Sequence, residues 1–150
     1  SDLAAREGML MGSLIAGLGL AVAGVGAVHA LAQALGGVDP VPHGVANALF
    51  LPDVMEFNRI GCREKYAKVA ALLGERVQGL SLDQASLKAV EAVRNLNQDL
   101  CIPRRLRDVN VPEDSLDLVA QRCLETQGCL ANNPRAMSLE EAKQIVRKAY

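Results

Sequence analysis

Both histidines of this chain lie within one stretch, HALAQALGGVDPVPHG, residues 29–44. Neutral imidazole is the commonest side-chain ligand of transition metals in proteins, so two histidines near each other in the sequence raise the possibility of a metal site. The spacing alone leaves two interpretations open. His29 and His43 are two ligands of one ion, or they are unrelated, with His29 in the core and His43 on the surface.

The letters around the two histidines predict two helices joined by a tight turn. His29 falls within an apolar helical pattern, and GGVDPVP, residues 36–42, is rich in residues that favour turns. Pro42 suits the first turn of a helix because the N–H that proline lacks is unpaired there in any case. His43 is therefore expected at a helix N-terminus, and the turn would bring it back towards His29.

The first 35 residues are expected to form helix in two pieces, because GLGLAVAGVGAV contains glycines that weaken a helix interior. Those glycines indicate close backbone contacts. No charged residue occurs from Gly8 to Val38, a length that could span a bilayer. Ala and Gly dilute its hydrophobicity, and the leading SDLAAREG lacks the basic region of a signal peptide. We therefore expect a fully buried core helix and no membrane span.

The middle of the chain predicts three further helices. GVANALFLPDVMEFN is a mainly apolar helix that Pro52 should kink or end, and the helix from Arg63 to Leu73 should close at Gly74. Ser81 and Gln84 match a capping box. The apolar positions that follow recur at helical spacing and predict one buried face: Leu87, Val90, Val93, Leu96 and Leu100.

Two helices are expected after the connector LCIPRRLRDVNVPEDS. The first has a buried face made of Leu116, Val119, Ala120 and Cys123. The last begins with Ser138 as N-cap and Glu141 three residues later, and it presents a second apolar face: Ala142, Ile145, Val146 and Ala149. No segment alternates as a strand would. The sequence therefore predicts an all-α fold, a multi-helix bundle formed by residues 1–150 as a single domain.

Composition argues against several classes of function. Sixteen Lys and Arg balance seventeen Asp and Glu, and aromatic residues make up 3% of the chain, so nucleic acid is not expected as a partner. The four cysteines form no C-x-x-C pair, which favours reduced thiols in a cytoplasmic protein over a zinc finger. The glycines near residue 20 follow no strand and lack the third glycine of a dinucleotide-binding turn.

A longer set of segments resembles a known family. VHALAQALGG and VPHGVANALFLPDVMEFN, followed by REKYAKVAALLG, IPRRL, VPEDSLDLVAQRC and NNPRAMSLEEAKQIVRKAY, resemble the iron-containing (group III) alcohol dehydrogenases. The resemblance covers nearly all 150 residues, and the pair of histidines with P-H-G at the second is its most specific part. It extends only to the C-terminal, all-helical half of that family. The family's α/β nucleotide-binding domain is absent from this chain.

The resemblance implies a ligand set and a reaction. His29 and His43 match two of the family's metal ligands, and an Asp and a further His would come from residues ahead of this segment. Such a site suits Fe²⁺, and it suits Zn²⁺ as well. The implied activity is hydride transfer between a small alcohol or aldehyde and NAD or NADP, which the missing N-terminal nucleotide-binding domain would bind. The parent enzyme is expected to be a homo-oligomer, and this chain alone is expected to be incomplete and inactive.

The chain departs from the family pattern at Gln33. Family members commonly carry a histidine four residues after the ligand that matches His29, on the same helical face and near the substrate. A glutamine can donate and accept hydrogen bonds but does not titrate near neutral pH. One consequence of Gln33 is that the substrate differs from that of family members with a histidine at this position. The alternative is a non-catalytic helical interaction or scaffolding domain that keeps the fold without the chemistry. Cys101, where relatives have a small residue before I-P, is interpreted as harmless.

Overall fold

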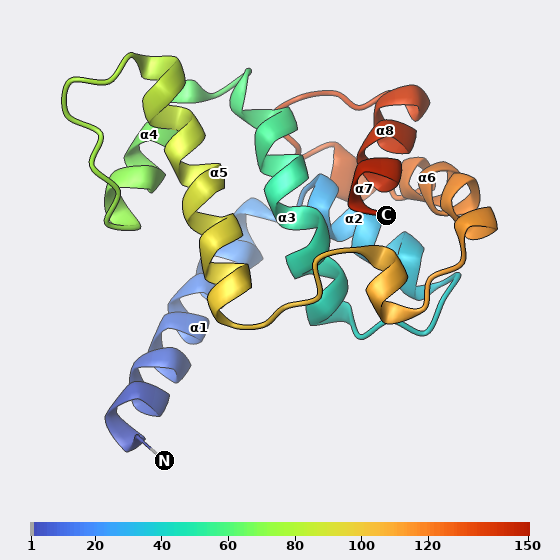
Figure 1. Ribbon diagram of the computed structural model, residues 1–150, viewed down its shortest axis with the longest axis horizontal. Helices are drawn as coiled ribbons and strands as arrows, with labels where there is room; N and C mark the ends of the chain where they lie inside the picture. Colours follow the sequence, from blue (N-terminus) through green and yellow to red (C-terminus); the bar gives the residue numbers. More distant parts are fainter. Residues whose placement is uncertain (1) are drawn as a thin grey trace.

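A computed structural model describes residues 2–150, and within that range the chain is helical with no strand. Figure 1 shows the arrangement of the helices. The α-helices are α1 (Leu3–Ala23), α2 (Ala27–Gly36), α3 (His43–Arg59), α4 (Arg63–Leu72), α5 (Leu82–Asp99), α6 (Leu116–Glu125), α7 (Gln127–Leu130) and α8 (Leu139–Ala149). Two short 3₁₀ helices, Leu106–Val109 and Glu113–Ser115, lie in the connector. The predicted all-α class is confirmed.

Helix α3 is the centre of the body. It packs against α2, α5 and α8, and its side chains contribute to both buried clusters of the molecule. Phe50 and Val54 join the larger cluster with α2, α6 and α8, whereas Met55 joins the smaller one with α4 and α5. In Figure 1 α4 and α5 stand on one side of α3, and α6 to α8 stand on the other. The position of α3 therefore sets the position of its first residue, His43.

Local sequence signals account for most helix ends. Ser81 and Ser138 each accept from the backbone three residues on, and Gln84 and Glu141 complete the two capping boxes. Gly74 follows α4 with a φ of 89°, a backbone conformation that glycine adopts at low cost. The predicted buried faces of α6 and α8 are confirmed. At the end of α5, however, Leu96 and the C-cap residue Leu100 are exposed, and neither belongs to the smaller cluster.

The prediction that Pro52 would kink or end a helix is wrong about the end. Helix α3 continues through Pro52 to Arg59. Proline has no N–H, so it cannot bond the carbonyl of Ala48 four residues earlier. The side-chain amide of Asn97, on α5, donates to that carbonyl instead, at 2.8 Å. A polar group on a neighbouring helix thus replaces the missing backbone bond and lets α3 remain continuous.

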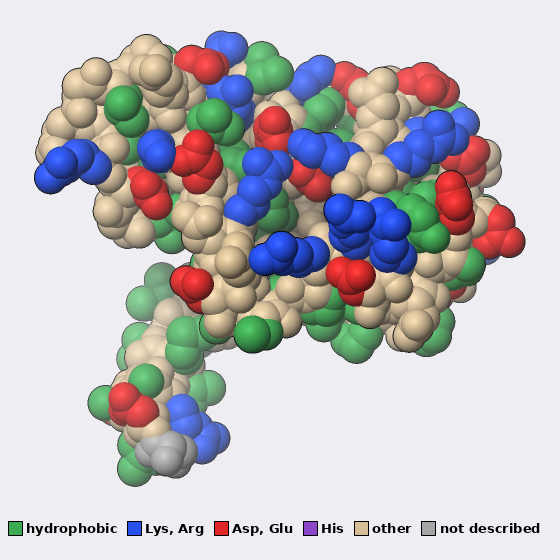
Figure 2. Space-filling view, in the orientation of Figure 1, with side chains coloured by type: hydrophobic (Ala, Val, Ile, Leu, Met, Phe, Trp, Pro, Cys, Tyr) green, Lys and Arg blue, Asp and Glu red, His purple; other side chains and the backbone are tan. Residues whose placement is uncertain are grey.

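Helix α1 contradicts the expectation of a buried core helix. No residue of α1 is buried, and Val22 is 92% exposed. The predicted break does occur, at Gly24 to Gly26, but Gly17 and Gly19 have no neighbour within 4 Å of an added Cβ. Figures 1 and 2 show α1 projecting from the body with charged side chains only near its free end. Within residues 2–150, α1 has no packing partner.

The length and composition of α1 would allow it to cross a membrane. Among the described residues it is the one helix that is long and apolar enough to do so, with a mean hydropathy of 1.3 over 18 residues. A helix that packs inside a larger protein has the same properties, because it too is apolar on all sides.

Candidate metal centre

The structure brings His29 and His43 together. Their ring centroids are 5.5 Å apart and the ring planes are inclined at 58°. His29 lies in the first turn of α2 and is half-buried, whereas His43 is the first residue of α3 and is exposed. The predicted helix–turn–helix around the two residues is confirmed. A shared site, one of the two interpretations of the sequence, requires such proximity of the two rings.

The turn between α2 and α3 is held by the rest of the fold. The backbone N–H groups of Val38 and Asp39 both donate to the carbonyl of Leu35. Ser115 donates to the carboxylate of Asp39 at 2.9 Å, and Arg122 donates to the carbonyl of Gly37 at 2.9 Å. These bonds fix residues 37–42 against α6 and the connector, so the approach of the two imidazoles does not depend on a loose loop.

The separation of the rings fits one ion held between them. A metal–nitrogen bond of about 2.1 Å places a ring centroid about 3.2 Å from the ion. Two such rings at a tetrahedral angle have centroids about 5.2 Å apart. The observed 5.5 Å is close to that value. Imidazole nitrogen is a donor that suits Fe²⁺ and Zn²⁺, so the residue types fit the implied ion as well as the spacing does.

Burial and charge keep His29 in the form that binds metals. Desolvation lowers its pKa below 6.5, and the neighbouring His43 lowers it further. The neutral ring retains a lone pair for a metal. In a metal site the other ring nitrogen usually donates to a carbonyl or carboxylate, but within residues 2–150 neither imidazole makes a hydrogen bond.

The described residues do not complete the site. Within residues 2–150 there is no cluster of three or more His, Cys, Asp or Glu side chains that could hold an ion. Two imidazoles leave at least two positions of a tetrahedral ion open. This part of the chain can therefore offer half of a ligand set.

Gln33 lies one helical turn after His29 and meets a residue that sequence reasoning missed. Its side chain is exposed, and its oxygen lies 3.8 Å from the thiol sulfur of Cys129. Cys129 is 96 positions away in sequence, and no local pattern connects it with the histidines. All four cysteines are free thiols, as expected.

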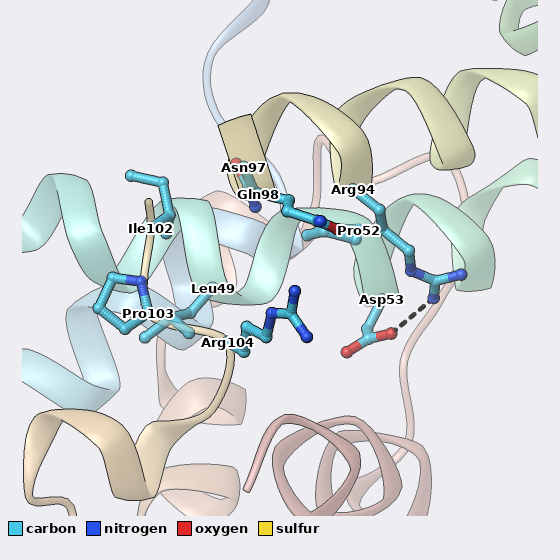
Figure 3. A pocket seen from close by; sticks show the side chains of 9 residues that line it. All are labelled: Leu49, Pro52, Asp53, Arg94, Asn97, Gln98, Ile102, Pro103 and Arg104. Atoms are coloured by element: carbon cyan, nitrogen blue, oxygen red, sulfur yellow. Dashed lines mark hydrogen bonds and ion pairs between the residues drawn. The ribbon is translucent and has the colours of Figure 1, made fainter. Parts of the chain in front are cut away.

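A pocket lies in another part of the molecule (Figure 3). It has a volume of about 240 Å³ and is formed by α3, α5 and the connector, and it includes neither histidine. Its one carboxylate, Asp53, accepts from Arg94 at 3.0 Å and lies 3.1 Å from the amine of Lys148. The charge of Asp53 is therefore satisfied within the protein, and this pocket is not an alternative metal centre.

Comparisons with known proteins agree with the fold. The model of the Fe-containing alcohol dehydrogenase family, C-terminal, matches residues 1–150. Lactaldehyde reductase of Escherichia coli (strain K12) is 42% identical over 149 residues, which are 99% of this chain and 39% of that protein. The 1,3-propanediol dehydrogenase of Klebsiella pneumoniae is 43% identical over 150 residues, which are 100% of this chain and 38% of that protein.

A solved structure is similar over the whole chain. The crystal structure of a 1,3-propanediol oxidoreductase superposes with a TM-score of 0.97 at 43% identity, covering 100% of this chain and 39% of that one. The present chain thus spans about two fifths of the length of the relatives it matches.

Proposed function

The chain belongs to the Fe-containing alcohol dehydrogenase family, as its C-terminal part, and from this premise we propose that it supplies half of the catalytic centre of an oxidoreductase. Residues 1–150 act as one helical metal-binding domain. His29 and His43 are two ligands of a divalent ion, Fe²⁺ or Zn²⁺. The substrate is a small alcohol or aldehyde, and an N-terminal domain binds NAD or NADP. The observation that carries the proposal is the 5.5 Å separation of the only two histidines in the chain.

The roles of the chain's own residues follow from their positions. His29 binds from a half-buried helix, where desolvation keeps the ring neutral, and His43 binds from the N-terminus of α3. Gln33 faces the substrate one turn beyond His29, where its amide can orient a hydroxyl or carbonyl but cannot transfer a proton near neutral pH. The bound ion would polarise the oxygen of the substrate as hydride moves to or from the nicotinamide.

The exposed apolar surface of helix α1 also supports the proposal that a second part of the protein is required. Nine of its large apolar side chains are exposed: Leu3, Met9, Leu10, Met11, Leu14, Ile15, Leu18, Leu20 and Val22. A soluble protein rarely leaves a surface of this kind uncovered. The relatives are more than twice as long as this chain. We propose that the additional part, which includes the nucleotide-binding domain, covers α1 and supplies the remaining metal ligands.

Domain complementation tests the proposal. The part of the Escherichia coli lactaldehyde reductase that precedes its matched segment is co-expressed with this chain, and oxidation of NADH by short aldehydes is measured after addition of Fe²⁺ or Zn²⁺. We expect no turnover from either part alone and measurable turnover from the pair. His29→Ala and His43→Ala should each abolish it, because a ligand lost from the ion removes the electrophile.

Three results would contradict the proposal. Turnover by the 150-residue chain alone would show that no second part is needed. A complemented activity that survives His29→Ala and His43→Ala would show that these residues do not hold the ion. If the pair forms a stable complex that binds metal through neither histidine and has no activity, the chain is a scaffolding domain. His43→Ala in the isolated chain, checked by circular dichroism, controls for misfolding.

A further inference from the structure

A loop far from the histidines in sequence bonds to both helices that carry them. Asn133 lies between α7 and α8, and its side-chain oxygen accepts from the backbone N–H of Ala27 at 3.1 Å. The same oxygen accepts from the amide of Asn58, on α3, at 2.9 Å. The amide nitrogen of Asn133 donates to the oxygen of Asn58 at 2.8 Å and to the carbonyl of Arg135 at 2.6 Å. Every polar atom of this side chain is therefore used.

The bond to Ala27 caps a helix that has no cap of its own. The N-cap position of α2 is Gly26, which has no side chain to accept from the first free N–H groups. Asn133 supplies the acceptor from another part of the chain. The fit is close, because a Cβ added at Gly26 would lie 3.0 Å from the oxygen of Asn133. His29 is two residues beyond the capped position.

The hydrogen bonds between Asn133 and Asn58 fix the position of the start of α2 relative to α3. Asn58 is buried near the C-terminal end of α3, whereas His43 is at the N-terminal end. The turn at residues 37–42 joins the two helices covalently at one end of α2, and the amide pair joins them at the other. Arg135, from the same loop as Asn133, also bonds to α3. It donates to the backbone carbonyl of Phe57 at 3.2 Å, and its guanidinium lies 3.9 Å from the centre of the phenyl ring of Phe57.

We propose that Asn133 is a positioning residue for His29: by capping α2 and pairing with Asn58 of α3, it holds the two imidazoles at the separation that a shared ion requires. Asn58 is buried, Asn133 is half-buried, and the amide groups of both are hydrogen-bonded, so a shift of either side chain leaves polar groups unpaired. The inference rests on the proposed function for its purpose, but the positioning itself is measurable without any metal.

Three variants and one control test the inference in the full 150-residue chain. Asn133→Ala removes both the cap and the pair. Asn133→Asp keeps an acceptor for Ala27 but loses the donor to Asn58, and Gly26→Ala crowds the oxygen of Asn133. Ser81→Ala is the control, because it removes a helix cap of similar kind from α5, which carries neither histidine.

Two readouts are compared. The first is the nuclear Overhauser effect between the ring protons of His29 and His43, which is unambiguous because the chain has only two histidines. The second is the affinity for Zn²⁺ by calorimetry. We expect the ring-to-ring signal to be lost in Asn133→Ala and weakened in Asn133→Asp and Gly26→Ala. Zn²⁺ affinity should fall about tenfold in Asn133→Ala, as when a partner of a metal ligand is removed. Ser81→Ala should change neither readout.

The outcomes separate this inference from the proposed function. If Asn133→Asp and Gly26→Ala fold and keep the ring-to-ring signal of the wild type, the positioning role is wrong. It is equally wrong if Ser81→Ala loses the signal to the same extent, because the effect would then reflect general loosening. If the wild type shows the signal but binds no Zn²⁺ through His29, the proposed function fails while the positioning role stands. Should Asn133→Ala not fold, the two milder variants decide the question.

Discussion

The continuity of α3 through Pro52 leads to a quantitative prediction about Asn97. Its amide bonds the carbonyl of Ala48, which Pro52 leaves without a backbone donor. Removing the amide by Asn97→Ala leaves that carbonyl unpaired in a half-buried position. A lost hydrogen bond of this kind costs about 1–2 kcal/mol of unfolding free energy. For a domain of this size the loss corresponds to a fall in Tm of about 2–8 °C.

The same substitution should matter much less when position 52 carries an N–H. In a Pro52→Ala background the new backbone N–H can donate to the carbonyl of Ala48, as in any α-helix. Asn97→Ala should then cost less than about 0.5 kcal/mol, which leaves a coupling energy of about 1 kcal/mol between the two positions. Changes in helix propensity and packing at each position occur in both backgrounds and cancel in the cycle.

Urea and thermal unfolding of the four proteins measure this coupling. The wild type, the two single variants and the double variant are compared by circular dichroism under identical conditions. Equal losses for Asn97→Ala in the two backgrounds would refute the reasoning, because they would show that Asn97 does not replace the bond that Pro52 removes. Arg94→Ala, one turn earlier on α5, controls for changes in the adjacent pocket (Figure 3).

Three further predictions concern other parts of the chain. Cys101, the residue after the C-cap of α5, has a φ of 54°, so Cys101→Gly should stabilise the chain by about 0.5–1 kcal/mol in urea unfolding. The gain should exceed that of Asn110→Gly, because asparagine tolerates its φ of 61°. The pKa of His29 in the folded state lies below its ordinary value of 6.5. Between these two pH values the unfolded chain therefore binds more protons than the folded chain. Stability should therefore fall as the pH drops from 7.5 through the folded pKa of His29, and by less in His29→Gln; equal slopes would contradict this. Leu14→Lys and Leu18→Lys together should reduce binding of an apolar dye and self-association in sedimentation, with stability unchanged within about 0.5 kcal/mol, because both side chains are exposed.

The features that the sequence predicted well are those whose signals are local. The capping boxes at Ser81 and Ser138 and the apolar face of α8 depend on residues three or four positions apart. The convergence of His29 and His43 depends on one short turn, and the helices on both sides of it were recognisable.

The features that escaped prediction depend on residues distant in sequence. Nothing near Asn133 indicates that it caps α2, and nothing near Cys129 indicates that it meets Gln33. Helix α1 was expected to be buried because it is apolar, but burial requires a partner surface, and residues 2–150 provide none. Cys101 is interpreted as harmless from the sequence, and its φ of 54° is a backbone feature that composition does not reveal.

The central claim is that the imidazoles of His29 and His43 bind the same divalent ion. X-ray absorption at the zinc edge tests it most directly, with the chain loaded with less than one equivalent of Zn²⁺. We predict two imidazole nitrogens per zinc at about 2.0–2.1 Å, with the remaining ligands from solvent, and one imidazole in either His29→Ala or His43→Ala. A zinc coordinated by one imidazole or none in the wild type, or a spectrum unchanged by both substitutions, would contradict the account.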